Sequence, residues 1–153
     1  MIDPKDIHGA IVHEHGRKDS LIRVTLKAVI LNDNGETLVV KETDRDWWDI
    51  PGGGLDHGES IKDALARELY EEVSFEGEFE YEVIDAQDPK YLEELNLYQM
   101  RVTFLVKPSA MNFKPGADGD EIQFIDSKIY EHSELFTERV IFEFSELAKK
   151  RLG

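Results

Sequence analysis

A glycine-rich loop that leads into an acidic helix constrains this chain more than any other stretch. Residues 53 to 75 read G-G-L-D-H-G-E-S-I-K-D-A-L-A-R-E-L-Y-E-E-V-S-F. In the second half, apolar residues recur at every fourth position, which is typical of an amphipathic helix with one buried face. This apolar stripe consists of Ile61, Leu65, Leu69 and Val73. The pattern therefore predicts a helix that packs on one side against a core.

Three glutamates lie at the edge of that stripe. Glu68, Glu71 and Glu72 are neighbours on a helical wheel, because residues three and four apart meet on a helix surface. Like charges at this spacing cost about 0.2–0.5 kcal/mol per pair, so a positive charge should compensate them. Mg²⁺ accepts oxygen ligands and is commonly held by carboxylates together with substrate phosphates. The glutamates therefore predict a site for a hard divalent cation.

The start of the helix indicates a second ligand. Ser60 and Asp63 form a Ser-x-x-Asp capping pattern, which satisfies free N–H groups in the first helical turn. Glycine allows a backbone to approach a ligand closely, and a helix N-terminus can donate N–H groups to phosphate. The glycines concerned are Gly52, Gly53, Gly54 and Gly58. Loop and helix together favour a metal-bound phosphate compound over the alternative, a solvated acidic face.

The full spacing resembles the Nudix box, the signature of the Nudix hydrolases. Gly53 is followed after five residues by Glu59, and after seven more by Arg67-Glu68-Leu69-Tyr70-Glu71-Glu72. The chain departs from the family pattern at Ser74, where the family has glycine, and at the aromatic Phe75. A glycine there takes a left-handed turn more readily than serine does. The preceding Trp48-Asp49-Ile50-Pro51-Gly52 resembles the strand that leads into a Nudix box.

The resemblance implies a fold and an activity. The fold is α/β, an α/β/α sandwich with a mixed β-sheet, and we expect residues 1–153 to form a single Nudix hydrolase domain. The activity is metal-dependent hydrolysis of a pyrophosphate bond in a nucleoside diphosphate linked to another moiety, with water attacking phosphorus. The cofactor is Mg²⁺ or Mn²⁺. The substrate stays open among nucleotide sugars, nucleoside triphosphates, dinucleotides and non-nucleotide pyrophosphates, because specificity depends on variable loops.

Several residues inherit roles from the resemblance. Arg67 should orient the carboxylates through charge-assisted hydrogen bonds, and Glu59 should support the loop. The general base is Glu68 or a late acidic residue, Glu121, with Asp120 and Asp118 as further candidates for that late position. The expected metal ligands are Glu68, Glu71, Glu72 and the main-chain carbonyl of Gly52. The expected substrate contacts are Trp48, Gly53, Gly54 and Tyr91, the last in a lid-like loop over residues 87–96.

Charge and composition narrow the classes of partner. The 18 basic and 33 acidic residues give a net charge of −15, which repels polyanions, so we expect a small phosphate substrate rather than extended nucleic acid. With no cysteine, neither a disulfide nor a thiol nucleophile is available. No apolar run is long enough for a membrane span, and the N-terminus lacks a signal core, so we expect no membrane partner and a cytoplasmic location. A homodimer stays open.

The remaining pattern predicts strands around the central helix. Residues 21–31 and 37–40 should form a hairpin across the turn at 32–35, and Trp47 and Trp48 should point to opposite faces of a strand. Further strands are expected at 76–86, 97–106 and 121–125, and a structural helix at 133–152.

Two other classes of function remain beside the hydrolase. The fold can serve as a catalytically weak ligand-binding or regulatory module, for which Ser74 is the local reason. The acidic helix can also be a plain interaction surface, although that hypothesis leaves the glycine-rich loop and Arg67 unexplained. Metal affinity separates the interaction surface from the other two, and turnover separates the hydrolase from the binding module.

Overall fold

The computed structural model describes residues 10–153 as two α-helices and a set of strands. The helices are α1 (Ile61–Val73) and α2 (Phe136–Leu152), with short 3₁₀ turns η2 (Glu93–Leu95) and η3 (Ser127–Tyr130). The strands are β1 (Ala10–Val12), β2 (Lys18–Ser20), β3 (Ile22–Val29), β4 (Thr37–Glu42), β5 (Gly52–Gly54), β6 (Phe79–Ala86), β7 (Lys90–Leu92), β8 (Leu97–Pro108) and β9 (Gly119–Ile125).

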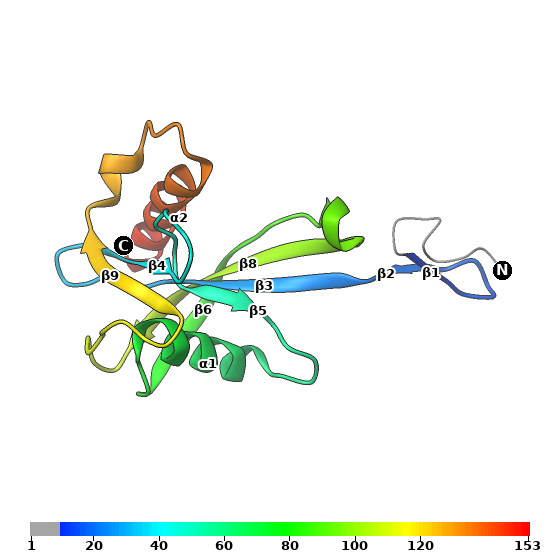
Figure 1. Ribbon diagram of the computed structural model, residues 1–153, viewed down its shortest axis with the longest axis horizontal. Helices are drawn as coiled ribbons and strands as arrows, with labels where there is room; N and C mark the ends of the chain where they lie inside the picture. Colours follow the sequence, from blue (N-terminus) through cyan, green and yellow to red (C-terminus); the bar gives the residue numbers. More distant parts are fainter. Residues whose placement is uncertain (1–9) are drawn as a thin grey trace.

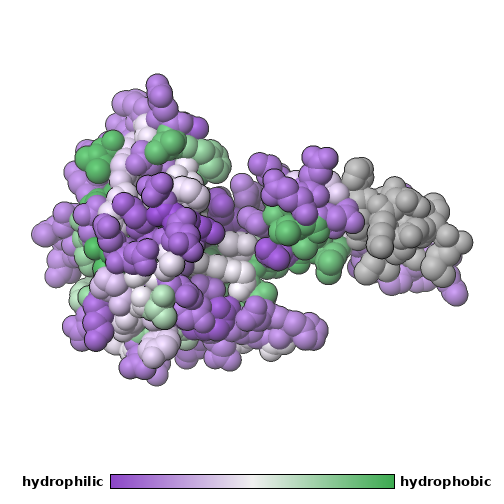
Figure 2. All heavy atoms as spheres, viewed as in Figure 1, coloured by the Kyte–Doolittle hydropathy of each residue, from purple (hydrophilic) through white to green (hydrophobic). Residues whose placement is uncertain are grey.

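The main sheet is mixed and has the strand order β5-β3-β8-β6, with β7 also paired to β8. Strands β3 and β8 run parallel, and the other pairs in this sheet are antiparallel. A second, two-stranded sheet joins β4 to β9. The β1–β2 hairpin extends away from the body of the molecule at the start of β3 (Figure 1). Figure 2 shows a mostly hydrophilic body, with apolar side chains gathered where that hairpin leaves it.

The two helices cover opposite faces of the main sheet (Figure 1). Successive residues of a strand point to opposite faces, so neighbouring residues of β3 enter different cores. Ala28 packs with Leu65 and Leu69 of α1, whereas Val29 packs with Ile141 of α2. These two clusters make the molecule an α/β/α sandwich with a mixed sheet, which confirms the expected fold class.

The predicted hairpin over residues 21–40 is only partly correct. The turn forms, because the Gly35 N–H donates to the Asn32 carbonyl at 3.0 Å. The strands then separate: β3 takes its partners from β5 and β8, and β4 takes β9, so a single bridge from Leu31 to Thr37 joins them. The short turn between the two segments suggested that they pair with each other. Each strand instead pairs with strands distant in the chain, which lets both faces of the sheet be buried.

The helix α1 begins and ends where the sequence indicated. The Ser60 hydroxyl accepts a hydrogen bond from the Asp63 N–H at 3.1 Å, which confirms the predicted cap. At the other end Ser74 takes a left-handed conformation (φ 54°, ψ 33°), and its N–H bonds to the Tyr70 carbonyl at 3.1 Å. Ser74 thus adopts the left-handed conformation despite the steric cost of its Cβ atom, a cost that glycine does not have.

The remaining predicted strands and the C-terminal helix form with shifted bounds, except for the strand predicted at Trp47 and Trp48. The C-terminal helix begins at Phe136 rather than 133. Residues 87–96, predicted as a loop or short helical turn, contain the helical turn η2 and also the strand β7. Trp47 and Trp48 lie in a bend before an isolated bridge, not in a strand. No helix among residues 10–153 is both long enough and apolar enough to span a membrane.

Candidate active site

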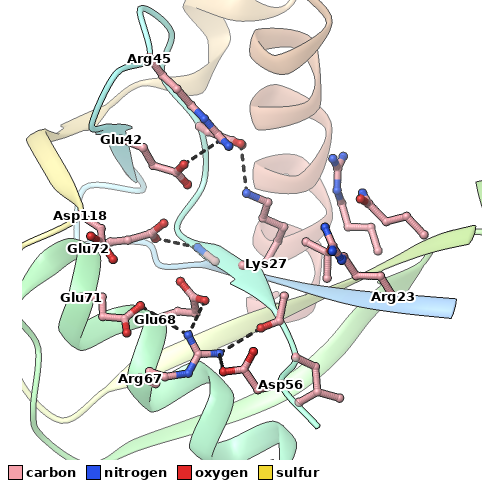
Figure 3. Close-up of a pocket in the computed structure, with 18 of the residues that line it drawn as sticks. Arg23, Lys27, Glu42, Arg45, Asp56, Arg67, Glu68, Glu71, Glu72 and Asp118 are labelled. Carbon is pink, nitrogen blue, oxygen red and sulfur yellow. Dashed lines mark hydrogen bonds and ion pairs between the residues drawn. The ribbon is translucent and has the colours of Figure 1, made fainter. Parts of the chain in front are cut away.

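A polar cavity of about 800 Å³ lies between α1 and the neighbouring edge of the main sheet. Its walls come from β3, β5, α1, the loop after β5 and the first half of β8. Residues near the end of β4 and in the loop before β9 also contribute. Figure 3 shows Glu68, Glu71 and Glu72 of α1 on one side of it, with Glu42 and Asp118 nearby. The carboxylates therefore converge on one cavity from three separate segments.

Glu72 is the most buried of these carboxylates, with 2% of its surface exposed. Its Oε2 accepts a hydrogen bond from the Gly52 N–H at 2.8 Å. Burial raises the pKa of Glu72 well above its ordinary value, because a buried carboxylate loses the water that stabilises its charge. A hydrogen bond to the Glu42 side chain raises this pKa further, because it favours the protonated form. Glu72 therefore takes up a proton more readily than an exposed carboxylate does when no cation is bound.

Arg67 ties the loop to the helix. Its Nε and Nη2 donate to the two carboxylate oxygens of Glu59 at 2.8 and 3.0 Å, a bidentate pair. Nη2 also donates to the Gly54 carbonyl at 3.0 Å, and Nη1 donates to Glu68 at 2.8 Å and to Glu71 at 3.4 Å. Arg67 lowers the pKa of Glu59 to about 2, so Glu59 is ionised throughout the neutral range. One guanidinium therefore positions both the loop backbone and two carboxylates.

Gly53 leaves the space that Glu68 occupies. A Cβ atom at this position would lie 2.3 Å from Glu68 Oε1, so no larger residue fits without displacing that carboxylate. Burial raises the pKa of Glu68, an effect opposed by its hydrogen bond to Arg67. Glu68 is consequently held against the backbone of β5 with a carboxylate that accepts a proton more readily than an exposed one.

The loop before β9 closes the far end of α1. The N–H groups of Lys114, Gly116 and Asp118 donate to the last free carbonyls of the helix, those of Val73, Glu72 and Glu71, at 3.1, 3.0 and 2.9 Å. A Cβ atom on Gly116 would lie 2.2 Å from the Glu71 carbonyl oxygen, so this backbone contact requires glycine. The same contacts bring Asp118 to the rim of the cavity.

The chemistry of the donor set fits a hard divalent cation. All the acidic groups that line the cavity offer oxygen atoms, and Mg²⁺ and Mn²⁺ prefer oxygen ligands. As the side chains stand, residues 10–153 contain no group of three or more acidic or histidine residues arranged to hold one ion. Glu68 and Glu71 turn toward Arg67 instead, and Glu72 toward Gly52, so these side chains must rotate before they share a ligand.

Four of the predicted site residues lie outside the cavity lining: Glu59, Trp48, Tyr91 and Glu121. Glu121 is exposed on β9, opposite Lys41. Trp48 packs against the α2-side core and lies under the Lys41 ammonium, 4.9 Å from the ring centre. Tyr91 on β7 donates its hydroxyl to Asn96 at 2.6 Å. The predicted residues that line the cavity are Gly52, Gly53, Gly54, Arg67, Glu68, Glu71 and Glu72, and Glu59 is bonded to Arg67. The roles of all these residues stay predictions.

The sequence analysis did not identify Glu42 or the nearby ion pair between Lys27 and Asp49. Glu42 ends β4 and pairs with Arg45 at 2.8 Å, while the buried Lys27 pairs with Asp49 at 3.0 Å. Lys27 carried one signal, since a lysine inside an apolar strand pattern is seldom buried unless it is paired. Glu42 carried none, because its position depends on how β4 pairs with β9.

Curated protein sequences match only part of this chain. A putative 8-oxo-dGTP diphosphatase of Bacillus subtilis is 35% identical over 75 residues, 49% of this chain and 50% of that protein. An RNA pyrophosphohydrolase of Ruthia magnifica is 44% identical over 70 residues, 46% of this chain and 38% of that protein. The chain thus spans half or less of the length of these relatives.

The fold is shared more widely than the sequence. A MutT protein from Methanosarcina mazei superposes with a TM-score of 0.66 at 20% identity, covering 86% of this chain and 98% of that one. An ADP-ribose pyrophosphatase from Streptococcus suis gives 0.64 at 21% identity, covering 85% and 91%. The family model for the NUDIX domain matches residues 21–146, which include both helices that form the sandwich apart from the last turns of α2. This chain therefore belongs to the Nudix family.

Proposed function

We propose that this protein hydrolyses a pyrophosphate bond in a nucleoside diphosphate linked to another moiety, and that it requires Mg²⁺ or Mn²⁺. The observation that carries the proposal is the convergence of Glu42, Glu68, Glu71 and Glu72 on one cavity beside a glycine-rich backbone. Anionic walls attract a phosphate only when a cation lies between them. Names of relatives, which include a diphosphatase and pyrophosphohydrolases, support the same reaction class.

Glu68, Glu71 and Glu72 would hold the cation, together with the Gly52 carbonyl. When bound, it would neutralise charge on the phosphate oxygens and orient the attacking water. Glu59 and Arg67 keep the loop and the carboxylates in place before substrate arrives, which lowers the ordering cost of binding. The N–H groups near Gly53 and Gly54 are the donors available to phosphate in this loop.

Glu68 is our choice for the general base that takes the proton from the attacking water. It lines the cavity, whereas Glu121 does not, and burial favours its protonated form once the proton has been transferred. Before a cation binds, Arg67 holds one oxygen of this carboxylate at 2.8 Å.

The test is a panel of nucleotide sugars, nucleoside triphosphates, dinucleotides and non-nucleotide pyrophosphates. Release of phosphate or nucleoside monophosphate is measured with Mg²⁺, with Mn²⁺ and with EDTA. We expect turnover of at least one class that EDTA abolishes and added metal restores. Turnover in EDTA would contradict the metal requirement, and metal and ligand binding without turnover would instead identify a binding module.

A further inference from the structure

A row of polar side chains extends from the carboxylates across the main sheet. In the parallel register of β3 and β8, Arg23 lies opposite Gln99, Thr25 opposite Arg101, and Lys27 opposite Thr103. Alternate residues of each strand face the same side of a sheet, so these residues share one face. Five of the six line the cavity; Thr103 is fully buried beneath it. The cavity therefore has a basic floor beside its acidic wall (Figure 3).

Most cations of this cavity are already neutralised. Lys27 pairs with Asp49 at 3.0 Å, Arg45 with Glu42 at 2.8 Å, and Arg67 with Glu59 and Glu68. Within residues 10–153, neither Arg23 nor Arg101 forms an ion pair, and the Nε of Arg101 is buried with no hydrogen-bond partner. A buried donor without a partner costs about 1–3 kcal/mol, so the arrangement favours a ligand that accepts from it.

The strand register separates the backbone of Arg23 and Arg101 from the backbone that binds Glu72. Gly52, whose N–H binds Glu72, is opposite Lys27, and Arg101 is one strand further across and two residues back along the chain. With strands about 4.8 Å apart and a rise of about 3.3 Å per residue, the Cα atoms of Gly52 and Arg101 are roughly 12 Å apart. Arg23 lies a further two residues along β3. This spacing suits two anionic groups separated by a sugar better than two directly linked phosphates.

We propose that Arg23 and Arg101 bind a second anionic group of the substrate, a phosphate monoester on the sugar next to the scissile pyrophosphate. Gln99 lies opposite Arg23 and adds a neutral donor beside it. Guanidinium groups pair with phosphate through two parallel N–H donors, and such charge-assisted bonds are stronger than neutral ones. The inference rests on the proposed function and names the substrate class within it: pyrophosphate compounds whose sugar carries an extra phosphate.

The first experiment measures binding without turnover. Isothermal titration with Mg²⁺ present compares adenosine 5′-monophosphate with the 2′,5′- and 3′,5′-bisphosphates, which differ only by one phosphate on the ribose. Hydrogen bonds to charged groups contribute about 1.5–3 kcal/mol, which is about tenfold to a hundredfold in affinity. We expect at least one bisphosphate to bind tighter by that factor. Equal affinities, or no measurable affinity for any of the three, overturn the inference.

Substitutions assign the preference to its residues. Arg101→Gln and Arg23→Gln should each reduce the ratio of bisphosphate to monophosphate affinity by about tenfold. Monophosphate affinity should change less than bisphosphate affinity. Arg101→Gln is the sharper of the two variants, because Arg23 Cδ lies 4.0 Å from the position of a Cβ atom on Gly54. Arg151→Gln is the matched control, since Arg151 is an exposed arginine in the last turn of α2 and its loss changes net charge equally. If Arg101→Gln does not fold, Arg23→Gln still tests the inference, because Arg23 is exposed and its substitution should leave the fold intact.

A second experiment separates this inference from the proposed function. Hydrolysis of NADPH is compared with that of NADH, which lacks the 2′-phosphate, and hydrolysis of coenzyme A with that of dephospho-coenzyme A, which lacks the 3′-phosphate. A higher kcat/KM for one phosphorylated partner, lost in Arg101→Gln, supports both proposals. Turnover with no such preference overturns the inference alone. Absence of turnover with a retained bisphosphate preference in binding overturns the hydrolase alone.

Discussion

The helices α1 and α2 pack on opposite faces of one sheet, yet they bury polar groups in different ways. On α2 the buried Ser145 hydroxyl contacts the Thr37 hydroxyl at 2.7 Å and donates to the Ile141 carbonyl at 2.6 Å. On α1 the buried groups are the carboxylates of Glu68 and Glu72. Hydrogen-bonded hydroxyl groups cost little when buried, whereas buried carboxylates are costly unless a cation joins them. This difference supports our proposal that α1 carries the site.

The C-terminal ends of the two helices also differ in the groups that compensate their free carbonyls. Basic residues in the last turn of α2 face its C-terminal carbonyls, as expected for a structural helix. The last turn of α1 has no basic residue, and backbone N–H groups of the loop before β9 bind its carbonyls instead. This end of α1 is therefore capped by loop backbone and not by basic side chains of its own last turn.

The largest effect should come from Glu72→Gln. We expect turnover to fall by at least about a hundredfold, the scale of a lost electrostatic group at a catalytic centre, because the amide cannot carry the charge that a cation needs. Circular dichroism should show an unchanged fold. Glu134→Gln is the control, since Glu134 is exposed and removes the same charge. Unchanged activity in the Glu72 variant would exclude this residue from the site.

Gly116→Ala should weaken the attachment of the loop to α1. The added methyl group meets the Glu71 carbonyl, and overpacking of this kind costs about 1–3 kcal/mol. We expect a lower free energy of unfolding in urea together with reduced turnover, because Glu71 and Asp118 are displaced. Ala117→Ser, at an exposed position in the same loop, should change neither. A stable and fully active Gly116 variant would contradict the role given to this contact.

The pH dependence of stability should reveal the buried carboxylate of α1. The pKa of Glu72 is higher in the folded protein than in the unfolded chain, where it is near 4.5. The folded state therefore binds the extra proton above that pH, and stability falls as pH rises toward the folded pKa, by at most about 1.4 kcal/mol per pH unit. Urea titrations of metal-free protein between pH 5 and 8 test this slope against Glu72→Gln, which should be flatter.

A smaller effect is expected on α2. Ser145→Ala leaves the Thr37 hydroxyl buried without its partner, which should cost about 1–2 kcal/mol of stability with kcat unchanged. Adding Thr37→Val removes the unpaired hydroxyl and should recover part of that loss. Thermal unfolding and steady-state kinetics measure both. Reduced kcat in a folded Ser145 variant would show that the two helices are not functionally separate.

Local patterns predicted much of this molecule. Periodicity and the Ser60 cap located α1, because helical contacts lie within four residues. Pairing between distant strands was not predictable in the same way: a one-residue change of register moves a side chain to the other face of a sheet. For this reason the sequence did not indicate Glu42. It also could not show that Glu121, our choice for the late acidic residue, is exposed while Asp118 lines the cavity.

The irregular pairing of β4 with β9 constrains the number of residues between positions 116 and 121 as well as their identity. Lys41 lies opposite Glu121 and Glu42 opposite Gly119, so Asp120 is an extra residue in β9. This bulge places Gly119 where a Cβ atom would lie 2.3 Å from the Glu72 carbonyl oxygen. Deleting one residue between 116 and 121 would draw the loop away from α1 even if every remaining side chain were kept. In this part of the chain, substitutions at exposed positions should be tolerated far better than insertions or deletions.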